Sequence, residues 1–342
     1  MIDNSTTEIH STSSPVNGNG SSSNPASQST GGKKIRVGLL ATEEKFSQAV
    51  MDLLNRDGDI QAEWCQFNDL QLGEPCPYRV IIDRLSHCYE FYQPYLKHAV
   101  MQGCYVINNP FWFLADDKFF NYVRAAQLGV AIPKTTLLRS REYDERVLRP
   151  QDLHNLPKPI DWQAIAEHIG FPAILKPYDG YGWREVYKVD NLQQLRSIYE
   201  ESMMDVMMLQ EYIDFEHYVR CFVVGKKWVL PTKYDPHARR YIVDHAHLTP
   251  ELGQRIVHDC LVINQALGYD INTVEFAIRD GIPYAIDFMN PVPDAKPEVI
   301  SQQYFGWLVT HVAKLVREVI AENRVSPYQL TNPSVAAAMS AV

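Results

Sequence analysis

Apolar and polar positions follow the periods of strands and helices from residue 34 onward. Between residues 34 and 110 they predict the order strand, helix, strand, strand, helix, strand. These elements are expected at residues 35–39, 46–54, 62–67, 78–82, 95–102 and 105–107. The run at 78–82 is mostly apolar, as in strands buried in a parallel sheet. We therefore expect a small α/β domain with a parallel sheet over residues 33–112.

Residues 113–322 carry a second series of elements with clear start and stop signals. Asp116 or Asp117 caps a helix that Gly129 ends, and Thr249 caps another that ends at Gly268. The other helices and strands are expected at residues 161–169, 171–176, 192–201, 206–211, 219–224, 228–232 and 304–321, with one more strand after Pro133. This order of helices and strands indicates α+β structure.

Both ends of the chain lack such patterns. Residues 1–32 are mainly Ser, Thr, Asn and Gly, so they cannot bury enough surface to offset the entropy of ordering, and we expect a disordered tail. Residues 323–342 form a C-terminal tail that is too short and too weakly patterned for a prediction. Over all 342 residues, 46% apolar and 21% charged is the balance of a globular protein of about two domains.

Charge and hydropathy argue against several classes of protein. A formal net charge of -9 argues against nucleic-acid binding, which rests on clustered Lys and Arg. The longest apolar stretches, such as 219–224, are much shorter than the ~20 residues of a membrane helix. No secretory signal opens the sequence, so we expect a cytoplasmic protein. The six cysteines form no CxxC pair, and we expect them to be reduced packing residues.

A hairpin at residues 273–290 gathers three oxygen-bearing side chains. Glu275 lies in its first strand, and Asp287 and Asn290 lie at the end of its second. Adjacent antiparallel strands can place the two carboxylates on one face. These oxygens suit Mg²⁺, with Mn²⁺ as an alternative, because such ions bind a few carboxylates and keep other positions for water and phosphate. Alternatively, Glu275 is solvated and the other two side chains only cap a turn.

The segment AILKPYDGYGW carries the opposite charge. Lys176 ends an apolar strand, where its ammonium would point into a cleft, and Gly180 and Gly182 let the backbone fold over phosphate oxygens. The segment has neither the Walker A pattern nor the Rossmann fingerprint. Alternatively, it is an ordinary glycine hairpin with an exposed lysine. Combined with the acidic hairpin, it supplies what Mg-ATP needs, namely cations for the phosphates and carboxylates for the metal.

In the order of its motifs the chain resembles the ATP-grasp superfamily, which includes D-alanine-D-alanine ligases, ribosomal-protein glutamate ligases and glutathione synthetases. ADDK with LGVAIPKT, and then FPAILKP with DGYGW, are similar to the family's first ATP-binding subdomain. LQEYI, VRCFVVG and DINTVEFAIRDGIPYAIDFMNP are similar to the adenine strand, the strand after it and the metal-binding hairpin. The resemblance spans residues 108–318. It implies the ATP-grasp fold, with two α+β subdomains at 113–205 and 206–322 after the N-terminal domain.

The resemblance also implies which residues hold the phosphates of ATP. Lys118 and Lys176 would bind them, and Gly180, Tyr181 and Gly182 would cover them as part of a closing lid at residues 179–183. Lys176 would also act in catalysis.

Other residues would bind the rest of the nucleotide and the transferred group. The linker beside adenine would be Gln210, Glu211, Tyr212 and Ile213. Glu216 is the candidate for the ribose hydroxyls. Many relatives carry the acid two residues later, at the position that is Tyr218 here. Arg220 would stabilise the transferred phosphoryl group in catalysis. Lys233 and the pair Arg239 and Arg240 are second candidates for that task, and the pair can equally form a solvated basic loop.

The sequence departs from the family at the end of the hairpin. Relatives carry an acid, one residue and then Asn, whereas Phe288 and Met289 separate Asp287 from Asn290 here. Asp294 could supply a further carboxylate. His237 lies in a polar loop with other His and Asp residues, to which we assign a surface or substrate-side role.

The implied activity is ATP-dependent ligation of a carboxylate to an amine through an acyl phosphate, which needs no protein nucleophile. The substrates would be an amino acid or a small peptide and an amine. Arg84, after a buried strand, could bind a substrate carboxylate or form a salt bridge within its domain. A small-molecule kinase and a nucleotide-binding regulator without turnover are the alternatives. Many relatives dimerise through the first domain, so a homodimer is one expected state.

Overall fold

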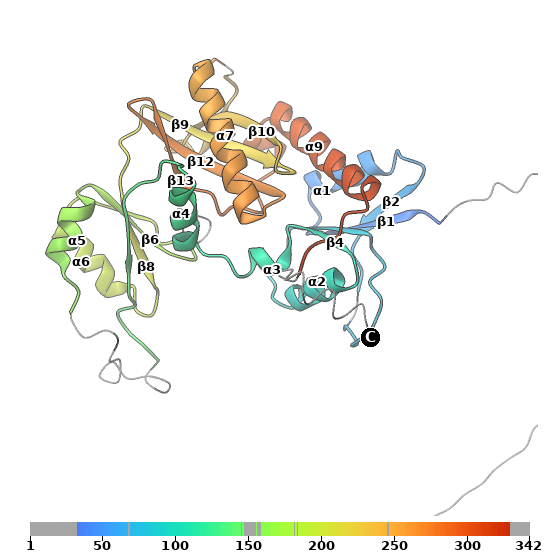
Figure 1. Ribbon diagram of the computed structural model, residues 1–342, viewed down its shortest axis with the longest axis horizontal. Coiled ribbons are helices and arrows are strands. Elements are labelled where there is room, and N and C mark those ends of the chain that lie inside the picture. The colour runs from blue at the N-terminus through green and yellow to red at the C-terminus, as the bar shows by residue number, and fades with distance from the viewer. Residues whose placement is uncertain are drawn as a thin grey trace, which may run out of the picture. The chain divides into compact units, whose positions relative to one another are not determined.

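The computed structural model describes residues 33–67, 69–144, 146, 155, 159–180, 182, 184–244 and 246–328 (Figure 1). The predicted tail at 1–32, most of the C-terminal tail and the predicted lid residues Tyr181 and Trp183 lie outside these residues. From Lys34 onward the chain forms one unit, in which the described residues build three β-sheets.

The first sheet is parallel, with the strand order β2-β1-β3-β4. Its elements, in chain order, are β1 (Ile35–Leu40), α1 (Lys45–Leu54), β2 (Ile60–Trp64), β3 (Val80–Asp83), α2 (Tyr92–Met101) and β4 (Tyr105–Ile107). All four residues of β3 are buried, as its apolar sequence predicts. The Asp83 carboxylate, at the end of β3, accepts hydrogen bonds from the backbone N–H groups of Leu85 and Ser86. The predicted parallel α/β domain is confirmed.

The second sheet has the order β5-β8-β6-β7, and each of its pairings is antiparallel. Its strands are β5 (Thr135–Leu138), β6 (Ala173–Pro177), β7 (Tyr187–Val189) and β8 (Met207–Glu211), and its helices are α5 (Trp162–Ile169) and α6 (Leu192–Glu201). Both helices pack with the sheet in one core. β8 follows residue 205, where we divided the subdomains, and it pairs with β5 and β6. The second sheet therefore contains strands from both sides of that division.

The third sheet is antiparallel, with the order β11-β10-β9-β12-β13. Its strands are β9 (His217–Val224), β10 (Trp228–Asp235), β11 (Arg240–Ile242), β12 (Ile271–Arg279) and β13 (Ile282–Asp287). Helices α4 (Lys118–Gln127) and α7 (Pro250–Leu267) share a core with it. Thr249 caps α7 by accepting from the Leu252 N–H, and Gly268 ends the helix with a φ of 77°. Only glycine adopts that backbone easily, so this helix ends where the sequence predicts.

Helix α9 (Gln302–Ala321) joins the first and third sheets. Its buried side chains share one core with β1 and α1 of the N-terminal domain and with β9 of the third sheet. Figure 1 shows α9 alongside α1. The first and third sheets are therefore joined by a helix that follows both in the sequence.

Asn108, just after β4, makes a second connection. Its buried side chain accepts hydrogen bonds from the N–H groups of Asp270 and Ile271, at 2.7 and 2.8 Å, at the start of β12. It donates to the carbonyls of Ile271, at 2.8 Å, and of Pro291, at 3.2 Å, after β13. One amide thus holds both ends of the hairpin that carries the predicted metal ligands.

The elements that the sequence did not predict are short. They are α3 (Pro110–Phe113), β7, β11 and α8 (Pro297–Ile300), which have three or four residues each. Such segments contain too few residues for a period to be visible. None of the described helices combines the length and the apolar character that a membrane crossing needs.

Candidate nucleotide-binding site

A cavity of about 430 Å³ is lined by residues of the second and third sheets and of α4. It gathers most of the residues that the sequence singled out: Lys118, Lys176, Gly180, Gly182, Gln210, Glu211, Tyr212, Ile213, Arg220, Glu275, Asp287 and Asn290. Five Lys and Arg side chains and three Asp and Glu side chains line it. This excess of positive charge suits an anionic ligand.

Lys176 lies near the end of β6 and is buried. Its ammonium donates to the Tyr122 hydroxyl at 3.0 Å, to Oε1 of Gln210 at 3.1 Å and to the carbonyl of Ile286 at 3.2 Å. An ammonium has three N–H donors, and in Lys176 each of the three has a neutral partner. Burial lowers the pKa of Lys176, although Asp287 and Glu275 oppose the shift.

Lys118 is the first residue of α4, which Asp117 caps by accepting from the Phe120 N–H at 2.7 Å. The lysine side chain is 7% exposed and contacts both oxygens of Asp287, at 2.9 and 3.0 Å. Burial alone would raise the pKa of Asp287, but the charges of Lys118 and Lys176 outweigh burial and hold it below its ordinary value. Asp287 is therefore ionised and paired.

Glu275 lies directly opposite Asp287 in the β12–β13 register and directly opposite Arg220 in the β9–β12 register. Residues opposite one another share a face of the sheet, so the two carboxylates lie on one face, as we expected. The register shifts between Glu275 and Phe276, which leaves Ile286 as an extra residue of β13. This bulge coincides with a carbonyl that accepts from both Lys176 and Tyr122. Bulges often redirect groups beside active sites.

Arg220 forms an ion pair with Glu275 at 2.8 Å. Its guanidinium lies over the rings of Tyr234 and Tyr241, at 4.7 and 5.4 Å from their centroids. Burial opposes the charge of Arg220, but Glu275 and the tyrosines outweigh it and raise the pKa. The buried Arg220 Nε has no hydrogen-bond partner among the described residues, so it retains a donor that a ligand could use.

Tyr218, two residues before Arg220 on the same face of β9, donates its hydroxyl to Glu275. Burial and the charge of Glu275 raise the pKa of Tyr218 well above its ordinary value, so the hydroxyl stays protonated. The tyrosine at this position thus fixes the predicted metal ligand.

The linker residues after β8 line one wall of the cavity. The side chain of Gln210 is occupied by Lys176 and by Thr135, to which its Nε2 donates at 3.0 Å. The Glu211 carboxylate pairs with Arg279 of β12 at 3.0 Å, and this ion pair joins the second and third sheets at this wall. The ring of Tyr212 lies under the ammonium of Lys188, 3.9 Å from it.

Other predicted residues lie elsewhere. Glu216 is exposed and accepts from the Asp280 N–H at 3.4 Å, and it is not part of the cavity lining. Lys233 pairs with Asp244 at 3.0 Å, also away from that lining. A backbone N–H thus holds the Glu216 carboxylate, and a carboxylate holds the Lys233 ammonium, both away from the cavity. Tyr181 lies outside the described residues.

The further candidates also have structural partners. Arg84 pairs with Glu44 and donates to the carbonyl of Pro293 at 3.2 Å, so the alternative of a salt bridge within the domain holds. Asp294 accepts from the Lys296 N–H at 3.1 Å. The pair Arg239 and Arg240 is exposed at the turn between β10 and β11. The cavity lining includes none of these side chains.

Sequence reasoning gave no nucleotide-binding role to several lining residues: Arg184, Lys188, Phe215, Tyr218 and His237. Their nearness to the predicted residues in the sequence was the available signal for the first four. His237 is different, because the turn between β10 and β11 brings it to the cavity. The Asp235 carboxylate fixes that turn by accepting hydrogen bonds from the N–H groups of His237 and Ala238. Its ring stacks on that of Phe215, with centroids 6.5 Å apart.

The donors in the cavity fit a hard divalent cation that also binds phosphate. Among the described residues, no three His, Cys, Asp and Glu side chains gather into a complete metal site. Glu275 and Asp287 provide two carboxylates on one face, and Asn290 lines the same cavity. Mg²⁺ needs few protein ligands when phosphate and water supply the others.

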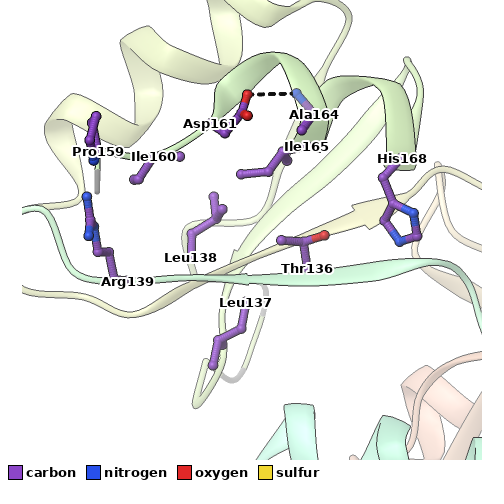
Figure 2. Close-up of a pocket in the computed structure, with 10 residues that line it drawn as sticks. All are labelled: Thr136, Leu137, Leu138, Arg139, Pro159, Ile160, Asp161, Ala164, Ile165 and His168. Carbon is purple, nitrogen blue, oxygen red and sulfur yellow. Dashed lines mark hydrogen bonds between the residues drawn. The ribbon is translucent and has the colours of Figure 1, made fainter. Parts of the chain in front are cut away.

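A second hollow, of about 450 Å³, lies between β5 and α5 (Figure 2). Apolar side chains such as Leu138, Ile160 and Ile165 line it, and Asp161 there is occupied in capping α5 through the Ala164 N–H. It shares no lining residue with the cavity described above. A triphosphate needs cations and N–H donors, so the first cavity is the better candidate.

Solved structures with the same arrangement identify the fold. D-alanine-D-alanine ligase from Bacillus anthracis, complexed with ATP, superposes with a TM-score of 0.59 at 15% identity, over 84% of this chain and 96% of that one. The chain has the ATP-grasp fold. An ATP-grasp RimK-domain protein from Sphaerobacter thermophilus gives a TM-score of 0.57 at 19% identity, over 82% of this chain and 99% of that one.

A third solved structure has a similar fold. The ATP-grasp ligase PsnB, complexed with minimal precursor, Mg and ADP, gives a TM-score of 0.57 at 14% identity, over 82% of this chain and 98% of that one. No protein-family model matches the sequence, and no curated protein matches it. The ATP-grasp fold is therefore recognised through the structure and the order of the motifs.

Proposed function

We propose that the protein is an ATP-dependent carboxylate-amine ligase that forms an amide through an acyl phosphate. One observation carries the proposal: a single cavity brings Lys118 and Lys176 together with the opposed carboxylates Glu275 and Asp287. Cations and carboxylates in one cavity are what Mg-ATP requires. The solved ligases of this fold support the same activity.

In this proposal the phosphates lie beside Lys118, Lys176 and the glycine loop. Adenine lies against the linker from Gln210 to Ile213, where the backbone reads its edge. Glu216 lies outside the cavity, so we assign the ribose to the wall of Phe215 and His237. His237 is exposed and its turn is held by Asp235, so its ring can meet a sugar hydroxyl without rearrangement.

Arg220 and Lys176 would carry the catalytic role. The substrate carboxylate attacks the γ-phosphorus, the bond to the β-γ bridging oxygen breaks, and ADP leaves. The amine then attacks the acyl carbon and releases phosphate, while the nitrogen loses a proton. The protein contributes position and charge: Arg220 has an unused buried Nε–H, and Lys176 is fixed by three partners.

A divalent ion would be held by Glu275 and Asp287, with Asn290 beside them. When bound, Mg²⁺ or Mn²⁺ neutralises charge on the phosphate oxygens. The positions of these three side chains depend on Tyr218, which holds Glu275, and on Asn108, which holds both ends of the hairpin.

The acid and amine substrates would be an amino acid or a small peptide. We further propose that the protein acts in the cytoplasm, since ATP is supplied there. The homodimer stays a prediction. Release of ADP should be measured against a panel of amino acids and short peptides, each alone and in pairs. Fast release only with a pair supports the ligase.

The panel also separates the two alternatives. Full release with one alcohol-bearing compound would instead establish a kinase. ATP binding without ADP formation for any member would indicate a regulator and contradict the ligase.

A further inference from the structure

Both carboxylates that we predicted as metal ligands are neutralised by cations of the chain itself. Lys118 contacts the two oxygens of Asp287, and Arg220 contacts Glu275. A divalent ion at the same carboxylates must therefore compete with two positive charges that are already present.

The two pairs differ in how firmly the cation is held. Arg220 and Glu275 face each other on adjacent strands, and two tyrosine rings flank the guanidinium. Lys118 reaches Asp287 from another element, the first turn of α4, on a flexible four-carbon side chain. Of these two cations, Lys118 is the one whose head group can move without breaking a sheet contact.

We propose that Lys118 changes partner during ligand binding: it neutralises Asp287 in the ligand-free protein and transfers to phosphate when the nucleotide enters, so that a divalent ion binds Asp287 only together with the nucleotide. The proposal rests on the proposed function, because it takes the ligand of the cavity to be a metal-bound nucleotide.

The charges in the cavity explain the coupling. A divalent ion arriving alone would have to displace Lys118 and leave a buried ammonium without its anion, which is unfavourable. A nucleotide arriving with the ion offers phosphate oxygens to the same ammonium, so the lysine exchanges one anion for another. The coupling between the two ligands is reciprocal. The ion must therefore strengthen nucleotide binding by the same factor as the nucleotide strengthens ion binding.

Lys176 cannot take the same part. Its three N–H groups already donate to Tyr122, Gln210 and Ile286, none of which is an anion. Its charge is available to a phosphate, but it does not occupy the carboxylates. Lys118 is therefore the lysine whose removal should free Asp287 for metal.

The test measures binding of Mn²⁺ to the full chain by electron paramagnetic resonance, without and with a non-hydrolysable ATP analogue. For the wild type we expect Mn²⁺ to bind at least tenfold more tightly with the analogue. Lys118→Met should bind Mn²⁺ about tenfold more tightly than the wild type when no nucleotide is present. The matched control is Lys134→Met, an exposed lysine outside the cavity lining, which should behave as the wild type.

Two further variants locate the effect. Adding Asp287→Asn to Lys118→Met should remove the gained Mn²⁺ site, and Lys118→Arg, which keeps a cation, should bind Mn²⁺ alone as weakly as the wild type. Equal Mn²⁺ affinity of the wild type with and without the analogue would overturn the proposal. A folded Lys118→Met variant without any gain would also overturn it.

Other results concern folding and the proposed function. If Lys118→Met fails to fold, Lys118→Gln, which also removes the positive charge, replaces it in the same comparison. Absence of analogue binding to the wild type would instead contradict the proposed function, and the gain of Mn²⁺ in Lys118→Met without nucleotide would still test the competition.

Discussion

Arg220 lies opposite Glu275 across two neighbouring strands and forms an ion pair with its carboxylate at 2.8 Å. The carboxylate also accepts from Tyr218, so the predicted metal ligand is part of a buried polar network. Replacing it therefore affects stability as well as chemistry.

Glu275→Gln should lower ADP release at least 100-fold, because it removes one negative charge from the predicted metal site. It should also lower the free energy of unfolding by about 2 kcal/mol, since hydrogen bonds to a charged group are replaced by weaker ones. Urea unfolding and ADP release, measured on the same preparation, check both. Tyr218→Phe serves as control, since it keeps the charge of Glu275 and should lose stability with a smaller loss of turnover. Unchanged turnover in Glu275→Gln would refute the site.

Lys176 predicts a dependence of stability on pH. Burial lowers its pKa from the ordinary 10.5, so between the lowered value and 10.5 the unfolded chain binds more protons than the folded chain. The contribution of this group to stability therefore rises as the pH rises through that window. Lys176→Met removes the titration, and the wild type should gain stability relative to it as the pH rises through that window towards 10.5. A difference that is constant with pH would contradict the assigned burial effect.

His237 predicts how the sugar of the nucleotide is recognised. The wild type should bind ATP about tenfold more tightly than 2′-deoxy-ATP or 3′-deoxy-ATP, the effect of one hydrogen bond. His237→Phe should bind ATP and the deoxy nucleotide equally. Calorimetry measures these affinities, with His217→Phe as a matched control, because His217 is exposed and outside the cavity lining. Discrimination that persists in His237→Phe would move the ribose away from this wall.

The hydrogen bonds of Asn108 predict that the contact between the first and third sheets affects nucleotide binding. Asn108→Ala leaves the buried N–H groups of Asp270 and Ile271 without an acceptor, and should lower the free energy of unfolding by about 2–4 kcal/mol. It should also weaken nucleotide binding, because the ends of the hairpin lose their anchor. Asn191→Ala, which removes only the cap of α6, should cost about 1 kcal/mol and leave nucleotide binding unchanged. Equal effects of the two variants would show that Asn108 acts only as a local contact.

Much of the fold could be predicted from the sequence because its signals are local. Caps and stops such as Thr249 and Gly268 mark helix ends, and the hairpin around Glu275 is joined by a tight turn. The structure places the carboxylates of that hairpin on one face because adjacent strands leave little choice of register.

The remainder depends on contacts between distant segments. Nothing local to Lys118 indicates that it pairs with Asp287, 169 residues later. Glu216 follows the linker, yet it lies outside the cavity, while His237 enters through a turn whose position depends on the whole sheet. The extra residue in β13, Ile286, comes before the DFMN ending, and the position of its carbonyl beside Lys176 depends on the register of the strands.

The position of α9 bears on how the protein is made. Residues of α1 leave the ribosome long before the side chains of α9 that complete their core, such as Leu308 and Val312, have been synthesised. During that interval the apolar face of α1 has no covering, and such surfaces favour aggregation. The growing chain should therefore depend on chaperones until α9 emerges, and pulse-labelled chains halted before residue 302 should be far more sensitive to protease than chains halted after residue 328.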